Sequence, residues 1–166
     1  MEEKELRIEE PKVERPPRSV GFLISQLGFF SSRKFHDALE PLGIGPRDFL
    51  LMRFVAASDG QSQQALADRL QVPPSRMVAL VDHLEDAGLV ERRPDPDDRR
   101  VRGLYLTRKG RGVLNRASKI AIDYETQLCA GINREEREQL IDLLQKLQAS
   151  QTHLKGVHPG IGEETP

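Results

Sequence analysis

The segment from Ser62 to Gly110 constrains the fold more than any other part of this 166-residue chain. Apolar residues recur at helical spacing in two short stretches, 62–70 and 74–87. Two runs with strand character follow, 89–93 and 101–106, on either side of a loop rich in arginine and aspartate. This loop is too long and too charged for a tight hairpin turn. The segment therefore predicts a helix-turn-helix that ends in a two-stranded wing.

The ends of these two short helices carry residues that helix termini prefer. Ser62 can accept a backbone hydrogen bond as an N-cap, and Pro74 fits a first helical turn because no intrahelical amide is needed there. Gly88 supplies the C-terminal stop of the second helix. The residues expected to face inward are Ala65, Leu66 and Leu70 in the first helix and Met77, Leu80, Val81 and Leu84 in the second.

Amphipathic helical patterns flank the central segment on both sides. An apolar stripe after the N-cap Ser19 predicts a long helix over residues 19–43, and a shorter helix follows it. On the other side, Thr107 can cap a long helix, and Asn133-Arg134-Glu135-Glu136 has the spacing of a capping box that starts a last helix. The helices after the wing occupy residues 107–154. Helices therefore dominate the chain, and strands are confined to the wing.

The central unit is too small to cover the apolar stripes of three long helices. Dimerisation through the terminal helices would bury these stripes, whereas a closed monomeric bundle is the alternative. The expected fold class is mainly α with a small β wing, a winged helix-turn-helix lobe flanked by N-terminal (19–43) and C-terminal (107–154) dimerisation helices. The residues expected at the homodimer interface are Val20, Leu23, Leu27, Ala121, Tyr124, Leu140 and Leu144.

Charge is distributed unevenly along the chain. The formal net charge is −1, so the overall balance gives no indication of a nucleic-acid partner. From Arg92 to Arg116, however, there are nine basic and three acidic residues, which gives this stretch a formal charge of +6. A block of this kind suits a phosphate-binding surface, although a charge run is more often a solvated face. A helix pair that ends in a basic hairpin has the shape to enter one DNA groove and touch the next.

The patterns together predict one domain over residues 19–154, in which the helix-turn-helix occupies 62–87 and the wing 89–106. Residues 1–18 and 155–166 are expected to be flexible tails, since they hold few apolar residues and several prolines or glycines. No apolar run approaches the about 20 residues needed to span a bilayer. The N-terminus is acidic rather than signal-like, and the single cysteine suits a reducing compartment. These features indicate a cytoplasmic location and no membrane partner.

Several motifs of the central segment resemble the MarR family, the multiple-antibiotic-resistance-type bacterial transcription regulators. They are Leu66-Ala67-Asp68-Arg69-Leu70, Leu80-Val81-Asp82-His83-Leu84-Glu85, Asp86-Ala87-Gly88-Leu89-Val90-Glu91-Arg92, Asp95-Pro96-Asp97-Asp98-Arg99-Arg100 and Leu104-Tyr105-Leu106-Thr107-Arg108-Lys109-Gly110. The resemblance extends over residues 20–154. It implies an obligate dimer with intertwined terminal helices, whose two lobes bind a pseudo-palindromic operator in double-stranded DNA. Repression is the default expectation, because a dimer that covers a promoter blocks polymerase without further contacts.

The resemblance also assigns residues to the DNA. The recognition helix, about 74–87, would enter the major groove and the wing would enter the adjacent minor groove, with Arg100 as the wing-tip arginine. Asp98 would hold the wing in place, and Arg99 and Arg102 would contact phosphates. The expected DNA-binding residues are Ser62, Gln63, Ser75, Arg76, Val78, Ala79, His83, Asp98, Arg99, Arg100 and Arg102.

The recognition helix departs from the family pattern. Family members commonly carry arginines where this chain has Ala79 and His83, and a small hydroxyl residue where it has Arg76. Val78 and Ala79 could contact thymine methyl groups, while Val78 could equally pack against the preceding helix. These changes predict a DNA target sequence that differs from the targets of other family members. They also motivate an alternative function, a winged-helix scaffold that binds protein without sequence-specific DNA binding.

Family members often sense small aromatic or phenolic compounds in a cleft between the dimer helices and the DNA lobe. Phe30, Lys34 and Arg53 are the candidate residues here, because apolar rings with one or two cations suit an organic anion. Instead of binding an effector, Phe30 could belong to the hydrophobic core and Arg53 could be a solvated surface residue. Some members instead oxidise a cysteine in the first helix. Cys129 lies near the end of the fifth helix, so a buried packing role is expected for it.

No pattern in the chain indicates catalysis, a metal or a cofactor. The four histidines do not pair at a spacing of four on a helix, and there is no second cysteine to complete a zinc site. The sequence also lacks a glycine-rich phosphate loop and a nucleophile elbow. An enzyme is therefore not expected.

Overall fold

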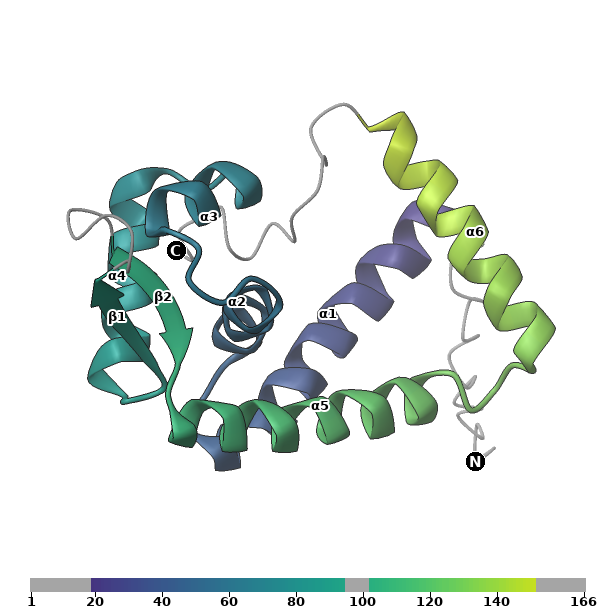
Figure 1. Ribbon diagram of the computed structural model, residues 1–166. Helices are drawn as coiled ribbons and strands as arrows, with labels where there is room; N and C mark the ends of the chain where they lie inside the picture. The colour runs from purple at the N-terminus through teal and green to yellow at the C-terminus, as the bar shows by residue number, and fades with distance from the viewer. Residues whose placement is uncertain (1–18, 95–101, 152–166) are drawn as a thin grey trace, which may run out of the picture.

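The computed structural model describes residues 19–94 and 102–151 (Figure 1). The predicted tails, 1–18 and 155–166, lie outside these residues. The same is true of Asp98, Arg99 and Arg100, which the sequence places in the wing loop. The elements run in the order α1 (Val20–Leu39), the 3₁₀ turn η1 (Glu40–Leu42), α2 (Pro46–Ala57), α3 (Gln63–Leu70), α4 (Pro74–Asp86), β1 (Val90–Pro94), β2 (Arg102–Leu106), α5 (Arg108–Leu128) and α6 (Arg134–Ser150). The mainly α fold with a small β wing is confirmed.

The predicted helix starts are confirmed by their caps. The side chains of Ser62 and Thr107 accept the backbone N–H groups of Ala65 and Gly110 at 3.1 and 2.9 Å. Asn133 and Glu136 make the reciprocal bonds of a capping box, at 3.0 and 2.8 Å. The first helix ends earlier than its apolar stripe predicts. Its α-helical part stops at Leu39, because the η1 turn and the left-handed Gly43 redirect the chain toward α2.

The hydrophobic core lies inside the winged lobe and where α1, α2 and α5 meet it. Met77, Val81 and Leu84 of α4 are fully buried, as their spacing predicts, and Leu80 packs beside them half-buried. In α3 the sequence interpretation was wrong at one position. Ala65 is exposed, whereas Ala67 is buried with Leu66 and Leu70. In a helix of eight residues, two apolar stripes fit the sequence about equally well, and tertiary contacts decide between them.

The wing is an antiparallel pair whose register runs from Val90 opposite Leu106 to Pro94 opposite Arg102. The segment before α3 joins this sheet, because Gly60 donates to Leu104 and Leu104 donates to Gln61, both at 3.0 Å. A Cβ atom on Gly103 would lie 2.6 Å from the carbonyl oxygen of Gly60, so only glycine permits this approach. The root of the wing is thus fixed to the start of the helix-turn-helix.

The terminal helices extend away from the lobe. In Figure 1, α5 runs from the lobe toward the far end of the molecule, α1 lies against it at an angle, and α6 turns back. The structure describes α6 in full, and none of its residues is buried. The apolar stripes of α1 and α6 are exposed to solvent in the single chain, so the chain does not form a closed monomeric bundle. Among the described residues, no helix is long and apolar enough to cross a membrane.

Candidate nucleic-acid interface

The helix α4 presents its outer face to solvent. Its buried stripe leaves Ser75, Val78, Ala79 and His83 exposed. Val78 is 42% exposed, so a large part of its side chain is open to solvent. Arg76, the cation specific to this chain at the start of the helix, is half-buried. Exposed apolar groups beside polar ones on a groove-sized helix are suited to reading base edges.

His83 lies near a carboxylate of the neighbouring helix. Its Nε2 is 3.8 Å from Oδ2 of Asp48 on α2, and the same carboxylate oxygen accepts the backbone N–H of Gly45 at 2.8 Å. The imidazole is nevertheless 64% exposed. His83 therefore stays at the surface while its ring is directed toward the N-terminus of α2.

The start of α3 meets the wing through one arginine. Ser62 is occupied as the N-cap, whereas the side-chain oxygen of Gln63 accepts hydrogen bonds from Arg92 at 2.8 and 3.2 Å. Arg92 also binds Asp82 at 2.6 Å and Glu85, both on α4. Burial alone would lower the pKa of Arg92, but its hydrogen bonds to Asp82 and Glu85 outweigh burial and raise that pKa. Arg92 thus remains charged where β1, α3 and α4 meet.

Sequence reasoning missed this role of Arg92, although the residue was counted within the basic block and ends one of the motifs that resemble the MarR family. Its partners lie 7, 10 and 29 residues away, so no helical or strand periodicity links them. Of the residues expected at the wing, Arg102 lies exposed at the start of β2. The structure therefore brings Gln63, Arg102 and the outer face of α4 to one lobe.

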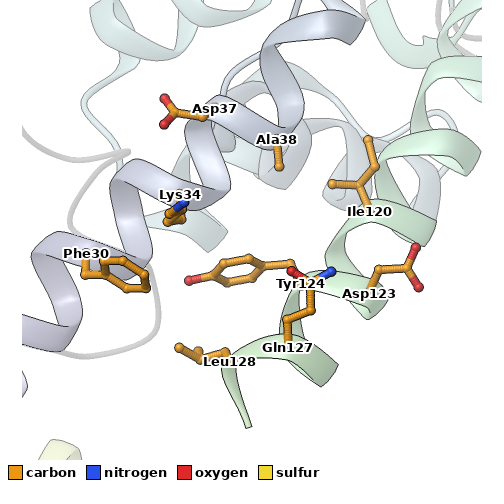
Figure 2. A pocket seen from close by; sticks show the side chains of 9 residues that line it. All are labelled: Phe30, Lys34, Asp37, Ala38, Ile120, Asp123, Tyr124, Gln127 and Leu128. Atoms are coloured by element: carbon orange, nitrogen blue, oxygen red, sulfur yellow. The ribbon is translucent and has the colours of Figure 1, made fainter. Parts of the chain in front are cut away.

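The three residues expected in an effector cleft do not share one cavity. Phe30 and Lys34 line a cavity of about 640 Å³ between α1 and α5, called here the α1–α5 cavity. Figure 2 shows Tyr124 reaching from α5 toward Phe30 across this space. Arg53 instead lines a second cavity of about 420 Å³ among α2, α5 and α6, called here the α2–α6 cavity. In the single chain, Phe30 and Lys34 therefore line one cavity and Arg53 the other, and residues of α5 line both.

The two cavities differ in charge. The α1–α5 cavity holds one cation, Lys34, and two carboxylates, Asp37 and Asp123. The α2–α6 cavity holds Arg53 and Arg137 with a single carboxylate, that of Glu125, and the apolar side chains Phe49, Ala121 and Ile122. Arg137 donates to Glu125 at 2.8 Å, and this hydrogen bond raises the pKa of Arg137.

The residues expected at a dimer interface fall into two groups. Tyr124 donates to the hydroxyl oxygen of Ser31 at 2.7 Å, and its ring lies 5.4 Å from that of Phe35, so it joins α5 to α1 within one chain. Ala121 is half-buried and lines the α2–α6 cavity. The exposed members of the set are Val20, Leu23 and Leu27 on α1 and Leu140 and Leu144 on α6.

Cys129 is half-buried rather than buried, which corrects the expected packing role. Its sulfur lies 3.8 Å from Oε1 of Glu125, at the end of α5. Within residues 19–94 and 102–151, no three histidine, cysteine or acidic side chains lie close enough together to hold a metal ion.

Comparison with known proteins identifies the family of the chain. Residues 42–101, which span the helix-turn-helix and the first part of the wing, match the model of the MarR family. The HTH-type transcriptional repressor Rv2887 of Mycobacterium tuberculosis is 28% identical over 128 residues, which cover 77% of this chain and 92% of the relative. This protein is a member of the MarR family. A MarR-family chain of this kind is a winged-helix transcription regulator that binds DNA.

Two solved structures of the repressor CouR extend the comparison to ligands. CouR bound to a 23-mer DNA duplex is 30% identical to this MarR-family protein, with a TM-score of 0.69 over 78% of this chain and 92% of that one. CouR of Rhodococcus jostii bound to p-coumaroyl-CoA is also 30% identical, with a TM-score of 0.65 over the same shares. The MarR-type arrangement of lobe and terminal helices thus occurs with DNA and with a small ligand in CouR.

Proposed function

We propose that this protein is a homodimeric repressor that binds a pseudo-palindromic operator in double-stranded DNA and is released from it by a small anionic effector. The outer face of α4 carries the proposal, because it is exposed, has the width of the major groove and lies beside the wing. Ser75, Arg76, Val78, Ala79 and His83 would meet base edges or nearby phosphates. Ser62, Gln63, Asp98, Arg99, Arg100 and Arg102 would fix the lobe on the DNA backbone and in the minor groove.

Dimerisation follows from the exposed apolar faces of the terminal helices. Side chains such as Leu27 and Leu140 are 56% and 45% exposed in the single chain, and each stripe continues along its helix. Contiguous apolar faces of this extent mark an interaction surface rather than a solvated one. A second copy of the chain supplies a matching face, because an isologous interface uses the same surface on both subunits.

The effector is assigned to the α2–α6 cavity on the basis of charge. The two arginines there outnumber the one carboxylate, and Arg53 lies 5.8 Å from the ring centre of Phe49, which suits an aromatic anion. The cavity volume of about 420 Å³ is within the range of small-ligand sites. Carboxylates predominate in the α1–α5 cavity, so Phe30 and Lys34 favour a neutral ligand or none.

A mobility-shift titration tests DNA binding, with a duplex that covers the intergenic region upstream of the protein's own gene. We expect affinity to fall steeply as salt rises, because phosphate contacts release counterions. Arg100→Ala should weaken binding by about tenfold or more without changing the melting temperature. Arg134→Ala, which removes a positive charge from the start of α6, should bind like the wild type. Salt-insensitive binding, or equal losses in both variants, would contradict the proposal.

The same titration separates a repressor from a protein-binding scaffold. A scaffold would leave the band unmoved at micromolar protein, whereas a repressor shifts it. The relatives and the DNA-bound neighbour favour the repressor.

A further inference from the structure

The side chain of Arg92 is almost fully engaged and largely enclosed. It leaves β1 and reaches three groups on the helix-turn-helix, namely Gln63 on α3 and Asp82 and Glu85 on α4. All three guanidinium nitrogens donate, and the backbone N–H of Arg92 also donates to Glu85 at 3.2 Å. The arginine side chain is 16% exposed, while those of Asp82 and Glu85 are 52% and 39% exposed. The cation thus lies beneath the carboxylates that it binds.

The position of the two carboxylates makes this cation relevant to DNA. Asp82 and Glu85 belong to α4, the helix assigned to the major groove, and they are partly open to solvent. Uncompensated carboxylates on a groove-entering helix would repel the phosphates on either side. Arg92 offsets one of the two negative charges and holds both side chains back against β1. Lysine could supply the charge at this place, but not three donors in a fixed plane.

The contact with Gln63 also fixes the direction of an amide. Its Oε1 accepts from Nε and Nη2 of Arg92, so the NH₂ group of the same amide must point away from the guanidinium. Reversing the amide would bring N–H groups against N–H groups. Gln63 therefore offers a donor, not an acceptor, beyond the first turn of α3. A donor at this place matches a phosphate oxygen and does not match the amino group of a base.

We propose that Arg92 is a positioning residue of the DNA interface: it keeps the carboxylates of α4 away from the phosphates and orients Gln63 so that its NH₂ group donates to the DNA backbone. The inference rests on the proposed DNA-binding function. It assigns Arg92 no contact of its own with DNA.

A double-mutant cycle tests the orienting role, with Gln63→Ala, Arg92→Lys and the double variant titrated against the intergenic duplex described above. Gln63→Ala should weaken binding by about fivefold, the range of one hydrogen bond. Arg92→Lys should weaken it by about tenfold, because the fork to Gln63 and Asp82 is lost while the charge is kept. In the Arg92→Lys background, Gln63→Ala should change affinity by less than about twofold. Additive losses would overturn the inference.

A second variant separates positioning from stability. Gln63→Glu keeps an oxygen for Arg92 and makes that contact an ion pair, so the melting temperature should stay the same or rise. The substitution removes the outward N–H donor, so DNA affinity should fall by about tenfold. Unchanged DNA affinity in this variant would reduce Arg92 to a structural residue. Arg69→Lys is the matched control, because Arg69 on α3 donates to Ser58 at 3.0 Å and lies over the ring of Phe54, away from the Arg92 contacts, and this variant should bind DNA like the wild type.

The outcomes also distinguish this inference from the proposed function. If the wild-type protein does not bind the duplex, both the proposed DNA-binding function and the role of Arg92 are contradicted. If the wild type binds but the affinity losses of the two single variants add up in the double variant, only the role of Arg92 is contradicted.

Discussion

Gly110 is the position where one added methyl group should disturb the protein most. It lies in the first turn of α5, against the last residue before the wing, and a Cβ atom there would be 1.9 Å from the carbonyl oxygen of Leu89. That is 1.5 Å less than the 3.4 Å at which ordinary contact begins. The same oxygen accepts the backbone N–H of Thr107 at 3.1 Å, so it cannot move without breaking the junction between α5 and the wing.

The expected cost of Gly110→Ala follows from this overlap. Overpacking costs about 1–3 kcal/mol where side chains can adjust, and a backbone obstacle places this case near the upper end, about 3 kcal/mol. Alanine's better helix propensity returns about 1 kcal/mol, which leaves a net loss of about 2 kcal/mol. In a chain of this size the melting temperature should fall by about 4–8 °C. Far-UV circular dichroism measures it at matched protein concentrations, because the stability of a dimer depends on concentration.

Gly112→Ala is the matched control. Gly112 lies two residues further along the same helix, and no atom lies within 4 Å of a Cβ added there. Here only the propensity acts, so the variant should gain about 0.5–1 kcal/mol and melt slightly higher than the wild type. The two substitutions are chemically identical and should shift the melting temperature in opposite directions. A Gly110→Ala protein as stable as Gly112→Ala would refute the reasoning.

Two further predictions concern the dimer and the effector. Leu144→Glu places a charge on the exposed apolar face of α6 and should give monomers in analytical ultracentrifugation, whereas Gln145→Glu on the polar face should remain dimeric; dimers in both would contradict the assigned interface. Arg53→Ala should weaken binding of 4-hydroxybenzoate, used as a small anionic aromatic probe in calorimetry, by about tenfold, because a charge-assisted contact is lost. Lys34→Ala should not change it, and the reverse pattern would move the anion site to the α1–α5 cavity.

Local chemistry made much of the fold predictable. The caps at Ser62, Thr107 and Asn133 act within three residues, so the sequence contains both partners of each hydrogen bond. The wing was recognisable because two short strand-like runs flank a loop that carries a distinctive arginine- and aspartate-rich motif. Ala65 shows where this reasoning ends, because a short helix needs tertiary contacts to select its buried face.

The site was less accessible to sequence reasoning, because its contacts join distant segments. Arg92 and Gln63 are 29 residues apart, and Tyr124 and Ser31 are 93 apart. Nothing in the spacing of Tyr124 distinguishes a dimer contact from a bond within the chain. Arg53 and Lys34 were likewise grouped by charge, whereas α5 places them in separate cavities. Composition identified the right kinds of residue but could not assign their neighbours.

Because Gly110 packs directly against the backbone at the root of the wing, we expect α5 and the winged lobe to move together. The helix has 21 residues and is therefore about 30 Å long, with one end locked to the wing and the other beside α6. A tilt of about 5° at the α6 end would displace the winged lobe by about 3 Å, as much as a whole hydrogen-bond length. We therefore expect that a ligand which tilts α5 near α6 would displace the lobe from the operator without contacting it.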